Sequence, residues 1–149
     1  MLRKRIGGSM LVSGIVGCGL ALGFMTGAWA GQALSDYGYY SDNGVDYRNH
    51  AAINTSSSSA YSVVLVSPRN KSVAGGWVGA MPQIYRNGAL WCTGTYTYNS
   101  AALAVNAVHN PTGCHSTGVA SWQAKGVTKS WNGSAYNAWW TSISPAQNS

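Results

Sequence analysis

The residues that could act as general acids or bases are distributed very unevenly along the chain. The three acidic residues are Asp36, Asp42 and Asp46, and no Asp or Glu follows them up to Ser149. A glycosidase normally uses two carboxyl groups across the scissile bond, and most calcium sites are also built from carboxylates. The sequence therefore argues against both chemistries after residue 46, and an Asp-oriented catalytic triad would have to take its acid from the N-terminal part. We expect this chain not to be an enzyme.

A small group of nitrogen and sulfur donors comes later in the chain. His109, Cys114 and His115 could bind a metal ion if the thiol were reduced. Cys92 and Cys114 are the only cysteines after residue 30, and an even number of cysteines predicts a disulfide if the chain is exported to an oxidising compartment. Because a cystine leaves two histidines, which make a weak site, we expect no metal and no cofactor. His109 is then expected to be a hydrogen-bonded turn residue before Pro111.

Residues 1–30 have the features of a cleavable signal peptide. Met1–Arg5 carries three basic residues, an uncharged and mostly apolar stretch follows, and Ala28–Ala30 has the small-x-small pattern of a cleavage site. Glycines dilute the apolar stretch too strongly for a membrane anchor. We expect a secreted chain that begins at Gly31 and leaves the membrane after cleavage. A lipidated Cys18 is the alternative, although apolar sequence continues well beyond it.

The exported part divides by composition into two segments. Residues 31–59 hold all the acids, four tyrosines and a serine run, which predicts a flexible Tyr/Asp-rich tail and a Ser linker. Residues 60–149 carry five basic residues and are predicted to form the folded domain. A tail of this kind could order on a secreted protein partner through tyrosine contacts and charge complementarity. The expected partner-binding residues are Asp36, Tyr37, Tyr39, Tyr40, Asp42, Asp46 and Tyr47.

Short β-prone runs bounded by turns fill residues 60–149. Tyr61–Val66 is β-branched, and Asn87-Gly88 and Asn132-Gly133 are hairpin signals between β-prone flanks. Ala102–Val108 and Thr117–Gln123 are predicted as further strands. The fold class expected is all-β: a small, disulfide-bridged antiparallel β-sandwich or barrel with an extended N-terminal tail.

Tryptophans suggest a surface of a different kind. If Cys92 points inward to its cystine, strand alternation turns Trp91 outward, unless a second sheet covers that face. Trp91, Trp139 and Trp140 are therefore candidates for an aromatic surface, and carbohydrate is an alternative partner. The five basic residues of the domain are scattered rather than clustered, which argues against nucleic acid.

Three short motifs resemble the first barrel of trypsin-like serine peptidases. They are Val78-Gly79-Ala80, Trp91-Cys92-Thr93-Gly94-Thr95 and Val105-Asn106-Ala107-Val108-His109, with the interval from Cys92 to His109 matching that family. Asn106 and Asn110 replace the Thr and Cys expected around the histidine, no acid follows, and no Gly-Asp-Ser-Gly-Gly sequence exists. The resemblance therefore implies a truncated or inactive relic of a peptidase.

The layout of the whole chain also resembles the small adaptor subunit of secreted bacterial umbrella toxin particles. In those particles a small β-protein with an extended N-terminal segment bridges a lectin subunit and a large toxin subunit. The resemblance implies a secreted, non-catalytic adaptor in an extracellular complex, such as an antibacterial toxin. This is the leading expectation; a peptidase relic and a lectin are the alternatives.

Overall fold

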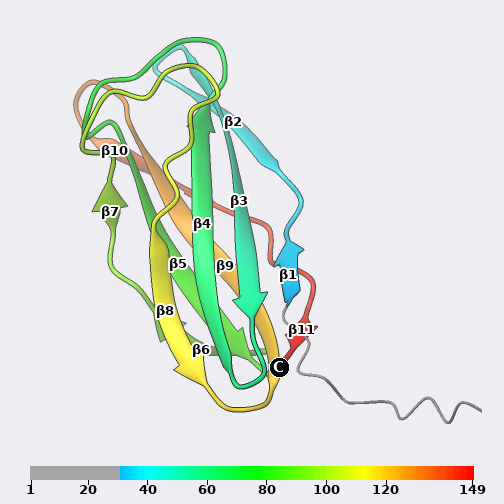
Figure 1. Ribbon diagram of the computed structural model, residues 1–149. Helices are drawn as coiled ribbons and strands as arrows, with labels where there is room; N and C mark the ends of the chain where they lie inside the picture. Colours follow the sequence, from blue (N-terminus) through cyan, green and yellow to red (C-terminus); the bar gives the residue numbers. More distant parts are fainter. Residues whose placement is uncertain (1–30) are drawn as a thin grey trace, which may run out of the picture.

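The computed structural model describes residues 31–149, so the predictions for residues 1–30, including the signal peptide and Cys18, lie outside the described residues. The described chain is all-β, with two antiparallel sheets that pack face to face as a sandwich (Figure 1). Residues 31–149 contain no helix, and therefore none that could cross a membrane.

The first sheet contains most of the N-terminal half of the described chain. Its strands are β1 (Gly31–Leu34), β2 (Gly38–Asp42), β3 (Val45–Thr55), β4 (Ser59–Pro68) and β8 (Thr112–Thr117). The order is β1-β3-β4-β8, and β2 also pairs with β3. The strands β1 and β2 therefore follow one another along the same side of β3, at its two ends.

The second sheet is centred on two long strands. Its members are β5 (Val78–Arg86), β6 (Ala89–Thr93), β7 (Thr97–Tyr98), β9 (Ser121–Trp131), β10 (Tyr136–Trp140) and β11 (Gln147–Asn148). The order is β10-β9-β5-β6, with β11 pairing with β9 and β7 with β5. The strands β5 and β9 are paired along their whole common length, from Val78 opposite Ser130 to Arg86 opposite Trp122.

The prediction of a flexible tail and linker over residues 31–59 is wrong. Asn43 and Gly44 have φ angles of 48° and 67°, so they form a tight turn that joins β2 to β3 as a hairpin. Along β3, Tyr47, Ala51 and Ile53 alternate with outward residues and are buried in the core. Burial of this apolar face fixes the segment, so residues 31–149 form one sandwich and not a domain with a tether.

Of the turns and strands predicted within residues 60–149, two hairpins are confirmed and one strand is wrong. Asn87-Gly88 has positive φ at both residues and joins β5 to β6, and Asn132-Gly133 lies in the loop from β9 to β10, so both hairpins are confirmed. The predicted strand Ala102–Val108 is wrong. A turn closed by Ala107 N–H donating to the Ala104 carbonyl interrupts it, and Asn106 has a φ of 63°.

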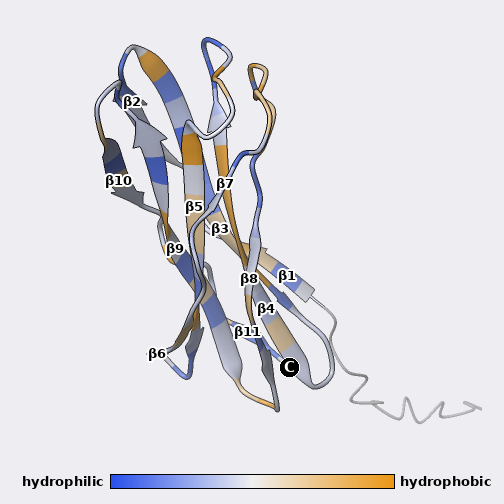
Figure 2. Ribbon diagram, turned by 90° about the vertical axis from the view of Figure 1, so that its left-hand side faces the viewer, coloured by the Kyte–Doolittle hydropathy of each residue, from blue (hydrophilic) through white to orange (hydrophobic). Residues whose placement is uncertain are grey.

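The core lies between the two sheets. Hydrophobic and hydrophilic residues alternate in bands along the strands (Figure 2), as expected when one face of each sheet is buried. The sheets approach closely at Gly126 of β9, where a Cβ would lie 2.4 Å from Val64 Cγ2 of β4. The predicted disulfide is confirmed: Cys92 of β6 bonds to Cys114 of β8, so it joins one sheet to the other.

Candidate functional site

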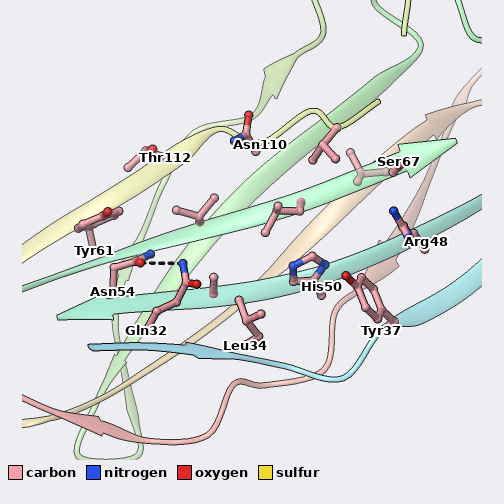
Figure 3. Close-up of a pocket in the computed structure, with 15 residues that line it drawn as sticks. Gln32, Leu34, Tyr37, Arg48, His50, Asn54, Tyr61, Ser67, Asn110 and Thr112 are labelled. Carbon is pink, nitrogen blue, oxygen red and sulfur yellow. Dashed lines mark hydrogen bonds between the residues drawn. The ribbon is translucent and has the colours of Figure 1, made fainter. Parts of the chain in front are cut away.

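The outer face of the first sheet carries a groove of about 510 Å³ (Figure 3). Because side chains alternate along a strand, burial of Tyr47, Ala51 and Ile53 turns the intervening residues of β3 to this outer face. The floor of the groove is apolar and comes from three strands. Its residues are Leu34 of β1, Ala52 of β3, and Val63 and Leu65 of β4.

One end of the groove is cationic. Arg48 Cζ lies 5.3 Å from the centroid of the Tyr37 ring, and the Tyr37 and His50 rings meet edge to face at 4.5 Å. Burial, and then the nearby charge of Arg48, lower the pKa of His50, which favours a neutral imidazole at pH 7. Arg48 therefore carries the positive charge here, and the residues that line the groove include no Asp or Glu.

The other end of the groove presents amides and an aromatic ring. Gln32 Nε2 donates a hydrogen bond of 2.8 Å to Asn54 Oδ1, and the Tyr61 ring stacks on His115 with centroids 5.3 Å apart. The wall opposite β1 is the segment that leads into β8, with Asn110 among its lining residues. The groove thus combines apolar contact area with hydrogen-bonding amides along its sides.

Two of the predicted docking tyrosines are inside the sandwich, so their assignment to a docking peptide is wrong. Tyr47 is 1% exposed, and the Tyr40 ring stacks between Tyr47 and Trp139 with centroids 5.1 and 4.5 Å away. The Tyr40 hydroxyl shares a hydrogen bond of 3.2 Å with Thr128 Oγ1 of the second sheet. Burial raises the pKa of Tyr47 to about 12. These rings hold β2 and β3 against β9 and β10.

Asp42 is the third predicted docking residue that is buried, at 8% exposed. Its carboxylate accepts hydrogen bonds from Ser130 Oγ of β9 and, at 3.1 Å, from Asn137 Nδ2 of β10. A carboxylate that bridges the two sheets in this way is occupied by the fold itself, so Asp42 is also wrong as a docking residue.

The remaining predicted docking residues lie on the surface but do not form one patch. Tyr39 is exposed beneath Arg69, whose Cζ is 4.9 Å from its ring centroid, and Asp46 accepts a hydrogen bond of 2.6 Å from Ser41 Oγ. Asp36 is exposed in the loop between β1 and β2. Of the seven, Tyr37 alone lines the groove.

Of the three tryptophans predicted to form an aromatic surface, two are exposed and one faces inward. Trp91 is 56% exposed and Trp140 is 58% exposed, and they lie on β6 and β10, the edge strands in the order β10-β9-β5-β6 of the second sheet. Trp139 instead faces inward and donates from Nε1 to Ser130 Oγ at 3.1 Å, so its assignment to this surface is wrong. Consecutive residues of a strand face opposite sides, which separates Trp139 from Trp140.

Sequence reasoning missed Arg48 and His50, the charged and titratable residues of the groove. The Asn43-Gly44 pair was the available signal, because it marks a hairpin and so makes residues 45–55 a strand with two faces. His109 has a ring nitrogen 2.7 Å from the Thr97 carbonyl oxygen, within hydrogen-bond distance. No group of three or more His, Cys, Asp or Glu residues within 31–149 could hold a metal ion.

No family model matches the chain, and neither a curated protein nor a solved structure matches it. The resemblances to trypsin-like peptidases and to umbrella toxin adaptors therefore stay predictions from the sequence.

Proposed function

We propose that this chain is a secreted, non-catalytic binding protein that holds a polypeptide segment of an exported partner in the groove. The observation that carries the proposal is the groove itself, with its apolar floor open on the outer face of the first sheet. Its volume falls in the range of ordinary ligand sites, and such sites combine an apolar lining with a few placed polar groups.

The shape and chemistry of the groove favour an extended peptide. The floor follows β3 and β4, and the amides of Gln32, Asn54 and Asn110 stand along it, where they could bond the backbone of a peptide. Arg48 supplies a positive charge at one end with no carboxylate in the lining. The partner segment should therefore carry apolar side chains and an acidic group that pairs with Arg48.

The proposal also includes export of the chain and its assembly into a complex. The signal-like residues 1–30 and the disulfide are both compatible with an extracellular location. A protein that holds a partner's segment in this environment would serve as an adaptor in an exported complex, including one with a toxic subunit. Carbohydrate binding is the second candidate, because Trp91 and Trp140 are exposed on the opposite sheet.

Selection from a displayed library of random peptides on purified residues 31–149 tests the proposal. We expect the selected peptides to share apolar residues and an Asp or Glu, and to bind Val63→Asp at least tenfold more weakly. Val119→Asp is the matched control, since Val119 is exposed and is not part of the groove lining. Arg48→Gln should remove the preference for the acidic residue, whereas Arg69→Gln should not.

Far-UV circular dichroism of each variant shows whether it is folded. The proposal is overturned if no peptide is selected, or if the selected peptides bind folded Val63→Asp as well as the unaltered protein.

A further inference from the structure

The outer face of the second sheet carries a continuous row of aromatic rings. In β9 the side chains of Trp122, Ala124, Thr128 and Ser130 are fully buried against the first sheet, so alternation turns Lys125, Lys129 and Trp131 outward. Tyr136 of β10 lies opposite Trp131, and β7 adds Tyr98 opposite Gly79. We call this surface the aromatic face; it comprises Tyr96, Tyr98, Trp131, Tyr136 and Trp140, with Lys125 and Lys129.

One of these rings lies flat on the sheet. A Cβ on Gly79 would be 2.7 Å from Tyr98 Cε1 and 2.8 Å from Cδ1, so the Tyr98 ring occupies the space that a side chain would fill. Its centroid is 5.0 Å from that of Tyr136 and 6.3 Å from that of Tyr96. Trp131 continues the row, 5.1 Å beyond Tyr136.

A shallow hollow of about 220 Å³ lies at the Trp131 end of the row. Trp131 and Tyr136 form part of its lining together with Gly75, Gly76 and Trp77. The Tyr136 hydroxyl donates to the Gly76 carbonyl, which ties the ring to the edge of the hollow. A Cβ on Gly76 would meet nothing within 4 Å, so this edge is open.

The aromatic face is also positively charged. Lys129 Nζ lies 4.0 Å from the Tyr96 centroid and Lys125 Nζ 4.9 Å from the Trp140 centroid. The two lysines are four residues apart on β9, which separates them by about 13 Å along the strand. The acids of the described chain, Asp36, Asp42 and Asp46, all belong to the first sheet or its loops, so none stands on this face to neutralise them.

We propose that the aromatic face binds an acidic polysaccharide. The faces of aromatic rings are electron-rich and attract the C–H groups that sugar rings present, so the row from Tyr96 to Trp131 offers stacking positions for successive sugars. The ammonium groups of Lys125 and Lys129 pair with carboxylates along the polymer. Single-stranded nucleic acid also stacks on aromatic rings, but its binding depends on a basic groove that follows the backbone, and two lysines supply little of that.

This inference goes beyond the peptide binding proposed for the groove, and it rests on the carbohydrate alternative, for which it names a surface and a class of ligand on the opposite side of the sandwich. The groove belongs to the first sheet and the aromatic face to the second, so each could be occupied while the other is bound. A chain with both surfaces would anchor an exported partner to an extracellular acidic glycan.

Isothermal titration of residues 31–149 with polygalacturonate tests the inference, with a neutral dextran and a single-stranded oligothymidylate as comparison ligands. We expect binding to polygalacturonate that weakens with added salt, weaker binding to oligothymidylate and none to dextran.

The double variant Lys125→Gln/Lys129→Gln should bind polygalacturonate at least tenfold more weakly than the unaltered protein, whereas Lys71→Gln should bind it normally. Tyr136→Ser should also lose at least tenfold, and Tyr39→Ser, an exposed tyrosine of the first sheet, should lose nothing.

Val63→Asp separates this test from that of the groove, since it should leave polygalacturonate binding unchanged. The inference is overturned if polygalacturonate does not bind, if dextran binds equally well, if oligothymidylate binds more tightly, or if the folded double lysine variant binds as the unaltered protein does.

Discussion

At the residue scale, His50 is a buried base beside a permanent cation. Burial and Arg48 lower its pKa in the folded state, so between that pKa and about 6.5 the unfolded chain binds a proton that the folded chain does not. Stability should therefore decrease as the pH falls below about 6.5. Urea unfolding at pH 7.5, 6.5 and 5.5 should show this decrease, and His50→Gln should reduce it.

His109→Gln is the matched control for this prediction, because His109 is half-exposed and belongs to no part of the groove lining. It should keep the decrease seen in the unaltered protein. An equal decrease in His50→Gln and in the unaltered protein would show that His50 is not its source.

Individual residues also show where composition misleads. The stretch from Asp36 to Tyr47 has the acids and tyrosines of a solvated peptide, yet Asp42 and Tyr47 are buried between the sheets. Composition describes the average of a segment, whereas burial depends on the position of each residue in the pleat. Trp139 and Trp140 illustrate the same point, since adjacent tryptophans face opposite sides of β10.

At the element scale, β2 provides a direct comparison between neighbouring side chains. Tyr40 packs between Tyr47 and Trp139, while Tyr39 points to solvent from the same strand. Tyr40→Ala should lower the free energy of unfolding by about 3–5 kcal/mol, as large aromatic truncations in a core do. Tyr39→Ala should change it by less than about 0.5 kcal/mol. Guanidinium unfolding of both variants measures the difference.

If this segment were a flexible tail, Tyr40→Ala and Tyr39→Ala would both leave the free energy of unfolding almost unchanged. Equal and small effects would therefore show that residues 38–42 do not pack against the second sheet.

Elements with a strong local signal could be predicted from the sequence. The β-branched run Tyr61–Val66 lies within β4, and the Asn87-Gly88 turn produces the β5–β6 hairpin. Ala102–Val108 has the composition of a strand, but it pairs through isolated bridges near its two ends, at Leu103 and His109, and forms no continuous ladder with a neighbouring strand. Strand propensity reflects the surroundings of a segment, so pairing could not be predicted from composition there.

The groove could not be predicted from the sequence either, because its lining requires β1, β3, β4 and the segment before β8 to be placed together.

At the scale of the whole molecule, the two sheets present different chemistry on opposite surfaces. One outer face holds an apolar groove with Arg48 at its end, and the other holds aromatic rings with Lys125 and Lys129. Polar residues such as Asn49 and Thr128 are buried between the sheets, joined by a hydrogen bond of 2.8 Å. Such an interior supplies less hydrophobic stabilisation than an apolar one, so covalent linkage of the sheets gains importance.

The disulfide provides that linkage, and its removal should have a large effect. Cys92 and Cys114 are 22 residues apart, and closing a loop of this length stabilises a protein by about 3 kcal/mol in the chain-entropy model. For a sandwich of this size the midpoint of thermal unfolding of Cys92→Ala/Cys114→Ala should fall by about 12 °C. Thr112 of β8 is part of the groove wall, so loss of the disulfide should also weaken peptide binding in the groove, while polygalacturonate binding at the aromatic face should not change.

Scanning calorimetry with and without a reductant measures the fall in the unfolding midpoint. The reductant should lower the midpoint of the unaltered protein to that of the double variant and leave the midpoint of the variant unchanged. A midpoint that is the same in both proteins would show that packing alone holds the two sheets together.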